Sequence, residues 1–340
     1  MKRTSLADIA DALGVSRTLV SMVLNHRGDK NGISSETQKK VWEKARELNY
    51  QPNRIARGLR LGKSNTLGLI VADISNSFYA RIARSIEDEA VKHGYQLLVS
   101  SSDEKESREK DLIERFLERQ VDGLIIASTL SDTDTLTGLC QQQVPFVLID
   151  RYFPDIQTNY VIVDNALAAE KMVSYLIENG FSRIGLLTIA PGHISSINDR
   201  VSGYKQALTK HGIVFDPDLV REISFDRLNQ EVAGAIHSLL SLTKKADAIF
   251  ALNNHIAVAC LESLSELGIS IPEEVALVSF DDENLFRFCQ PPITAISQPV
   301  KEMGKKAFEI LNQEINQKES TENNHQIVLP TRLEVRNSIK

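Results

Sequence analysis

The chain has 340 residues, of which 42% are hydrophobic and 25% charged, and its formal net charge is −6. This length exceeds one small domain, and the composition is typical of a protein with well-packed apolar cores. No apolar run reaches the roughly 18 residues of a membrane helix, and MKRTSLADIADAL lacks the apolar segment of a secretory signal. Because Cys140, Cys260 and Cys289 lie far apart without a CxxC pair, we expect a cytoplasmic protein without disulfides or a metal site.

The charge is distributed unevenly along the chain. Residues 1–62 hold 12 Lys or Arg and 6 Asp or Glu, whereas the remainder holds 27 and 39. A basic head on an acidic body suits a protein that brings only its head to a polyanion such as DNA. A basic surface that simply faces water is the alternative, and the motifs decide between the two.

The first two helices are predicted to form a helix-turn-helix motif. Ser5 and Asp8 have the spacing of a capping box before LADIADAL, and Gly14 is a typical residue to end that helix. Ser16 is expected to cap the second helix. The connection is therefore only three residues long, which is the spacing of this motif.

The second helix is expected to have two different faces. Val20, Val23 and Leu24 fall on one side of a helical wheel and would pack on the first helix. The other side carries polar and methyl-bearing side chains that could contact base edges in a DNA major groove, namely Ser16, Arg17, Thr18, Ser21, Met22 and Asn25. A plain solvent-facing surface is the alternative for this side.

A third helix and then an α/β body are expected to follow. Ser35 with Gln38 has the spacing that opens a helix, which would end before Tyr50. From Asn65 onward, apolar runs alternate with segments of helical length; the runs are 66–74, 95–102, 122–129, 145–151, 183–190, 247–254 and 275–282. This alternation favours parallel sheets covered on both faces, in two doubly wound subdomains. QIVLPTRLEVR is expected to form the final strand.

The segment YQPNRIARGLRLGKS (50–64) resembles the hinge of the LacI/GalR family of bacterial transcription regulators, whose usual pattern is YxPNxxARxLxxGxT. Other family patterns follow in order, from Thr4 to Asn25 in the head through LGLIVADISNSFYARIARSIEDEA, RVSGY and VSFDD to PPITAISQP. The resemblance covers residues 4–336. Met22 stands where many members have Arg, so we expect a contact less centred on guanine.

The resemblance implies a hinge helix that folds on DNA and inserts Leu59 into a minor-groove base step. Gly58 lowers helix propensity by about 1 kcal/mol, so a segment this short is expected to be unfolded alone. The implied minor-groove residues are Asn53, Arg54, Ala56, Arg57 and Leu59.

The implied fold is an all-α helix-turn-helix head joined by a hinge helix to an α/β body of two doubly wound subdomains, similar to periplasmic sugar-binding proteins. Such a body closes on a small molecule at the carboxyl ends of its strands. The expected boundaries are 1–50 for the head, 51–63 for the hinge and 64–340 for the body, with an N-subdomain of 64–162 plus 291–323 and a C-subdomain of 163–290 plus 324–340.

The residues expected to meet an effector follow predicted strands or match family motifs. Phe78 and Tyr79 lie where members stack an aromatic ring, and Arg200 in RVSGY matches the family's main effector arginine. The full set is Asp73, Phe78, Tyr79, Ser128, Arg151, Asp164, Arg200, Asn253 and Asp281. Their mixture of donors and acceptors suits a polyhydroxylated ligand. Asp73 and Asp164 could instead cap helices, and Asn253 and Asp281 could fix turns.

These observations favour a homodimeric repressor that binds a pseudo-palindromic DNA operator and responds to a small molecule. A sugar or sugar derivative is the favoured effector, and Arg81–Val91 is the expected dimer surface. A catabolite-control-type regulator dependent on a purine-like corepressor or a partner protein is the alternative. A sugar-binding protein without a DNA role is less favoured. We expect no enzyme and no cofactor, because GxGxxG, GxxxxGK[ST], GxSxG and HExxH motifs are absent.

Overall fold

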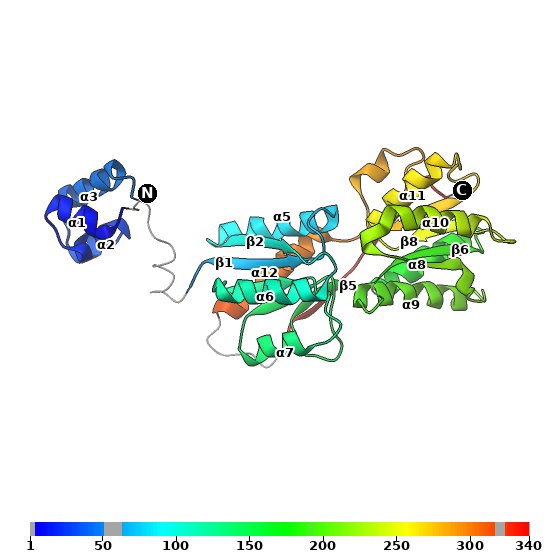
Figure 1. Ribbon diagram of the computed structural model, residues 1–340, viewed down its shortest axis with the longest axis horizontal. Helices are drawn as coiled ribbons and strands as arrows, with labels where there is room; N and C mark the ends of the chain where they lie inside the picture. Colours follow the sequence, from blue (N-terminus) through cyan, green and yellow to red (C-terminus); the bar gives the residue numbers. More distant parts are fainter. Residues whose placement is uncertain (1–3, 51–62, 191, 317–323, 340) are drawn as a thin grey trace. The chain divides into compact units, whose positions relative to one another are not determined.

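The structure, a computed structural model, describes residues 4–50, 63–190, 192–316 and 324–339 and divides into two compact units, residues 1–64 and 65–340 (Figure 1). We call the first unit the head and the second the body. Within the described segments, no helix combines the length and the apolar character needed to cross a membrane.

Local capping rules explain the first two helices of the head, α1 (Leu6–Leu13) and α2 (Arg17–Leu24). The predicted capping box is confirmed, because the Ser5 backbone N donates to Asp8 Oδ2 (2.7 Å) and the Asp8 backbone N donates to Ser5 Oγ (3.3 Å). Gly14 ends α1 at φ +64°, a left-handed conformation that glycine adopts without steric cost. The helix-turn-helix spacing is therefore built as expected.

The start of the third helix, α3 (Ser35–Glu47), differs from the prediction by one residue. The N-cap is Ser34, whose Oγ accepts a hydrogen bond from the Thr37 backbone N (3.2 Å), whereas Ser35 is already helical. Gln38 has another role, since its Nε2 donates to Asp29 Oδ1 (2.9 Å) and to the Ile33 carbonyl (2.8 Å). It thereby fixes the loop that contains the short 3₁₀ helix η1 (Asp29–Asn31).

The head has a small apolar core to which α1, α2 and α3 contribute. Its buried members are Ile9, Ala10, Val20, Val23, Val41 and Ala45. The aromatic rings of His26 and Trp42 lie 5.2 Å apart and join the end of α2 to α3. Because this core uses the apolar side of α2, as predicted, the opposite side of the helix is left on the surface.

The body consists of two lobes, each with a six-stranded sheet. The sheet of the N-lobe has the strand order β11-β5-β4-β3-β1-β2. Its strands are β1 (Thr66–Val71), β2 (Gln96–Ser101), β3 (Gly123–Ile126), β4 (Phe146–Ile149), β5 (Tyr160–Val163) and β11 (Gln326–Leu329). Its helices are α5 (Ser77–Lys92), α6 (Glu106–Glu118), α7 (Asp134–Gln141) and α12 (Val300–Asn316).

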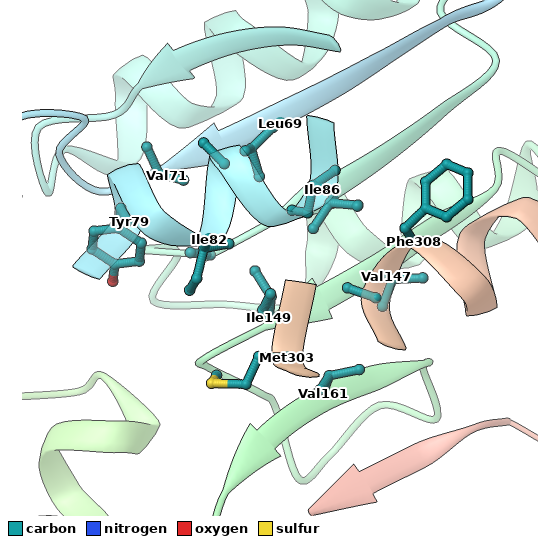
Figure 2. Packing of buried hydrophobic residues seen from close by; sticks show 14 of the residues in the cluster. Leu69, Val71, Tyr79, Ile82, Ile86, Val147, Ile149, Val161, Met303 and Phe308 are labelled. Carbon is teal, nitrogen blue, oxygen red and sulfur yellow. The ribbon is translucent and has the colours of Figure 1, made fainter. Parts of the chain in front are cut away.

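Helices cover both faces of the N-lobe sheet. On one face, Ile82 and Ile86 of α5 and Met303 and Phe308 of α12 pack against Val147 and its neighbours on the strands (Figure 2). On the other face, α6 and α7 pack over the alternate strand residues. Burial of both faces explains why the strands read as continuous apolar runs in the sequence.

The sheet of the C-lobe has the order β12-β10-β9-β8-β6-β7, and only β12 is antiparallel to its neighbour. Its strands are β6 (Ile184–Ile189), β7 (Val220–Ile223), β8 (Ala248–Ala251), β9 (Ala276–Phe280), β10 (Thr294–Ser297) and β12 (Arg332–Glu334). Helices α8 (Asn165–Glu178) and α9 (Ser195–Lys210) cover one face, and α10 (Leu228–Leu240) and α11 (Asn254–Glu266) cover the other. The 3₁₀ helices η2 (Pro217–Leu219), η3 (Phe225–Arg227) and η4 (Asn284–Arg287) lie in the connections.

Two doubly wound subdomains are thus confirmed, but two strands lie in the lobe opposite to the expected one. Residues 294–297, expected in the N-subdomain, form β10 and pair with β9 of the C-lobe. Residues 326–329, expected in the C-subdomain, form β11 and pair with β5 of the N-lobe. The predicted single final strand is also wrong, because Pro330 has no N–H to donate to a ladder and separates β11 from β12.

Candidate functional site

Two side chains on the surface side of α2 are exposed, and a third is half-buried. Arg17 and Thr18 are exposed at the first turn, and Met22 is half-buried one turn later. In the described part of the chain, no side-chain hydrogen bond or ion pair engages Arg17 or Thr18. The exposed guanidinium and hydroxyl, with the half-buried thioether, can thus reach the donors, acceptors and thymine methyl of a major groove.

The other three predicted major-groove side chains also serve the helix itself. Ser16 Oγ caps α2 by accepting from the Leu19 backbone N (3.1 Å). Asn25 Nδ2 donates to the Ser21 carbonyl (2.7 Å) and lies 3.4 Å from Ser21 Oγ. These contacts leave Arg17, Thr18 and Met22 as the side chains best able to read bases. The predicted minor-groove residues Asn53, Arg54, Ala56, Arg57 and Leu59 lie outside the described residues.

In the body, side chains from both lobes line a cleft. Seven of the nine predicted effector residues line it: Asp73, Phe78, Tyr79, Arg151, Arg200, Asn253 and Asp281. They come together because the carboxyl ends of parallel strands meet at one edge of each sheet.

Ser128 and Asp164 are the two predicted effector residues that face elsewhere. Asp164 is exposed, and its Oδ1 caps α8 by accepting from the Leu167 backbone N (2.9 Å), which is the helix-capping alternative. Ser128 is buried, and its Oγ donates to Oε1 of the buried Glu109 (2.6 Å). Asn253 has both roles, since it lines the cleft and caps α11 through the Ile256 backbone N (2.8 Å).

Arg200 is the central group of the cleft and is only 3% exposed. Its Nε donates to Asn165 Oδ1 (2.8 Å), and its Nη1 donates to the Leu252 carbonyl (2.7 Å). Its guanidinium carbon lies 3.7 Å from the centre of the Phe280 ring, a cation–π contact. These contacts fix the plane of the guanidinium group before any ligand arrives.

Two carboxylates, one from each lobe, face the Arg200 guanidinium. Asp150 Oδ1 lies 3.9 Å from Nη2, and Asp281 Oδ2 lies 3.9 Å from Nη1. Both aspartates end a strand in the left-handed region, with φ of +67° and +72°. Such backbone strain in non-glycine residues clusters at functional sites, where it is part of ligand positioning.

Burial changes the acid–base properties of these groups. Burial raises the pKa of Asp281, although the charge of Arg200 and the hydrogen bond from Gln298 oppose the rise. Burial likewise raises the pKa of Tyr79 well above its usual value, so its hydroxyl stays protonated and donates to Asp150 Oδ2 (2.9 Å). Asp150 Oδ1 has no hydrogen-bond partner among the described residues and is an acceptor available to a ligand.

Asp150, expected at the same strand end as Arg151, also lines the cleft. The cleft contains further residues that the prediction did not include: Asn76, Glu104, Ser196, Phe225 and His255. One of them carried a usable signal, because Ser196 lies one helical turn before Arg200. Glu104 and Phe225 lie in connections whose path through space no local pattern predicts.

Direct contacts between the lobes flank the cleft. Asn254 Nδ2 of the C-lobe donates to Asn76 Oδ1 (2.9 Å) and to Glu283 Oε1 (2.5 Å), which also accepts from Ser77 of the N-lobe. His193 Nε2 lies 3.0 Å from the Thr129 carbonyl. A ligand that bridges the lobes would add to these contacts and change the equilibrium between lobe arrangements.

Comparisons with known proteins match the head and the body to two different families. Residues 5–53 match the family described as bacterial regulatory proteins, lacI family. Residues 173–339 match the periplasmic binding protein-like domain. The two matches correspond to the head and to a large part of the body.

Relatives and a solved structure match nearly the whole chain. The probable HTH-type transcriptional regulator EndR of Paenibacillus polymyxa is 33% identical over 318 residues, covering 93% of this chain and 92% of EndR. Catabolite control protein A of Priestia megaterium is 32% identical over 336 residues, covering 99% of each chain. The complex of transcriptional regulator CelR with cellobiose is 29% identical, covers 99% of this chain and 100% of that one, and superposes with a TM-score of 0.71.

Proposed function

The chain belongs to the lacI family of bacterial regulatory proteins, and on this basis we propose that it is a dimeric repressor controlled by a sugar-like molecule. It is a DNA-binding transcriptional regulator with a helix-turn-helix head and a ligand-binding body. The observation that carries the proposal is the cleft of the body, where Arg200 lies between a carboxylate of each lobe. We propose that it acts in the cytoplasm, where the DNA is, and has no catalytic role.

A polyhydroxylated effector fits the cleft best. Each hydroxyl group can both donate and accept, and the cleft offers acceptors on Asp150 and Asp281 beside donors on Arg200 and Arg151. Phe78 and Phe225 add apolar ring surface on which the face of a sugar ring can lie. The complex of CelR with cellobiose supports a carbohydrate as the class of ligand.

Selection of random duplex DNA by the full-length protein tests the regulatory function. We expect enrichment of a two-fold symmetric site with a central pyrimidine–purine step, because two hinge helices would kink the duplex there. Addition of single sugars to the selected complex should then release the DNA. If DNA is enriched only when a sugar, a purine or a bacterial lysate is present, the protein depends on a corepressor instead.

Replacing Arg17 with alanine is expected to weaken binding by about 1–3 kcal/mol and to relax the preference at one base pair of each half-site. The reason is that Arg17 is exposed at the start of α2. Competition binding against operators changed at single base pairs measures the effect. Arg57→Ala is the contrasting variant, because loss of a phosphate contact should weaken binding to all sequences alike. Identical effects of both variants on every DNA would contradict base reading by α2.

The dimer surface Arg81–Val91 stays a prediction, and we propose that the dimer also buries the apolar surface at η4. Phe288 and Leu285 are 82% and 53% exposed there, which is costly for large apolar side chains in water. Sedimentation equilibrium should give twice the 37.9 kDa of one chain. Phe288→Asp is expected to weaken dimerisation about tenfold or more, whereas Val214→Asp, at a residue 87% exposed elsewhere on the C-lobe, should not. A monomeric wild-type protein, or equal effects of both variants, would refute this surface.

A further inference from the structure

The guanidinium group of Arg151 is already occupied within the cleft. Glu104 Oε1 lies 2.6 Å from Nη2 and Glu104 Oε2 lies 2.9 Å from Nη1, a two-pronged ion pair. The side chains of Arg151 and Glu104 are only 6% and 9% exposed, so solvent does little to screen the pair. Such parallel pairing is the geometry in which arginine otherwise recognises a phosphate or a ligand carboxylate.

Three of the five N–H groups of Arg151 are engaged, so two donors remain for a ligand, one on Nε and one on Nη2. Its Nη1 also donates to the Ser128 carbonyl (3.1 Å), whereas its buried Nε has no partner in the described part of the chain. The Nε atom lies 3.6 Å from Asp150 Oδ2. Burial acts to lower the pKa of Arg151, but the charge and hydrogen bond of Glu104, together with Tyr79 and Asp150, raise it overall, so the guanidinium remains charged. Arg151 thus offers only the edge formed by Nε and Nη2, and its Nε lies next to the carboxylate of Asp150.

The cleft is lined by more acidic than basic side chains, which disfavours the binding of an anion. Two arginines, Arg151 and Arg200, line it together with four carboxylates, Asp73, Glu104, Asp150 and Asp281. The outer edge of Arg200 faces Asp150 and Asp281, so an anion there would approach both carboxylates. Like charges brought together in a poorly solvated site cost several kcal/mol.

We propose that Glu104 sets the charge selectivity of the cleft, so that it accepts uncharged polyhydroxylated molecules and rejects those bearing phosphate or carboxylate groups. The proposal rests on the function proposed above and specifies its ligand class. A ligand hydroxyl can donate to Asp150 Oδ1 and accept from Arg151 Nε, which satisfies both unpartnered atoms. A fully ionised phosphate group has no proton for Asp150, so it would have to approach that carboxylate at the open edge of Arg151 or displace Glu104 from the other edge.

Glu104→Gln tests this assignment with inorganic phosphate as the probe. The wild-type protein is expected to show no saturable phosphate binding in calorimetry. The variant should bind phosphate saturably, with a dissociation constant at least about tenfold below the highest phosphate concentration tested on the wild type. Gln retains the size of the side chain but leaves the charge of Arg151 uncompensated. Glu104→Asp, which retains the carboxylate, should behave as the wild type. Adding Arg151→Gln to Glu104→Gln should abolish the phosphate binding, which locates it in the cleft.

Two results would overturn the assignment. One is saturable phosphate binding by the wild-type protein that Arg151→Gln removes, and the other is a folded Glu104→Gln protein that gains no phosphate binding. Operator binding by the same preparations, measured without ligand, reports on the regulatory function separately. A protein that selects no DNA but shows the phosphate switch would refute the regulator and leave the role of Glu104 intact.

A second measurement needs no variant. Thermal shifts of the wild-type protein are compared for matched pairs of ligands: glucose with glucose 6-phosphate, ribose with ribose 5-phosphate, and galactose with galacturonate. The largest stabilisation in the panel should come from an uncharged member. A charged member that stabilises the protein more than its uncharged counterpart, or a panel without any stabiliser, would refute the proposed selectivity for uncharged sugars.

Discussion

Replacing Gly203 with alanine is expected to lower the free energy of unfolding by about 3 kcal/mol and to weaken effector binding. A Cβ atom at position 203 would lie 2.1 Å from the Ala166 carbonyl oxygen and 2.9 Å from Ala169 Cβ. The first of these atoms belongs to the backbone of α8, so α9 must move away from it. Because Arg200 lies on α9 one turn before Gly203, the shift would also displace the central group of the cleft.

Chemical denaturation of the full-length protein measures this loss, and Gly234→Ala is the matched control. Gly234 lies inside helix α10, and a Cβ atom there would meet nothing within 4 Å. Alanine at this position should therefore leave stability unchanged or raise it by about 0.5–1 kcal/mol through helix propensity. Equal effects of the two substitutions would show that close packing of α8 on α9 does not explain Gly203.

Arg200→Met is expected to abolish the effector response, with a loss of effector affinity of about 100-fold or more, and to destabilise the body by about 3–5 kcal/mol. The substitution removes the hydrogen bonds to Asn165 and Leu252. It also removes the cation that lies between Asp150 and Asp281, which are 4% exposed, and leaves only Arg151 beside Asp150. Operator binding without effector should persist, because the head lies in the other compact unit.

The stability deficit of Arg200→Met should depend on pH in a defined direction. The charge of Arg200 opposes the rise in the pKa of Asp281, so its loss raises that pKa further. A carboxyl group with a raised folded-state pKa binds its proton more tightly when folded, so its cost is greatest above that pKa. The deficit should therefore shrink as pH falls through the folded-state pKa towards the ordinary pKa of aspartate. A deficit that grows on acidification would contradict this account.

Arg227→Met is the control for a lost arginine at the surface. Arg227 is 67% exposed and pairs with Glu231 at 2.7 Å, within a single helical turn. Solvent screening and side-chain entropy make such exposed pairs contribute little, so the change in unfolding free energy should stay within about 0.5 kcal/mol. A loss as large as that of Arg200→Met would mean that burial does not distinguish the two arginines.

Sequence rules predicted the features that depend on neighbouring residues. The capping box at Ser5, the left-handed Gly14 and the cap at Ser16 each involve atoms within three residues of one another, so their chemistry is visible in the sequence. The start of α3 shows the limit of the same rules. Two adjacent serines can both cap a helix, and only the path of the loop selects Ser34 over Ser35.

The cleft was predictable in its strand-end residues but not in its geometry. Asp164 and Asp281 both follow an apolar strand, yet one caps an exposed helix start while the other faces Arg200. The difference arises from the left-handed turn at Asp281, which redirects its side chain and has no signature in a single sequence. Glu104 enters the site for a similar reason, since φ of +54° carries the chain towards Arg151.

The placement of β11 in the N-lobe sheet and of β10 and β12 in the C-lobe sheet has a consequence for synthesis of the protein. Each lobe depends on a strand that is synthesised after α12, because β11 completes one sheet and β12 the other. During translation the finished head therefore precedes a body in which both sheets still have an open edge, a state prone to aggregation. A premature stop just after α12 would damage both lobes together. A ligand-responsive body can thus first exist once both β11 and β12 have been synthesised.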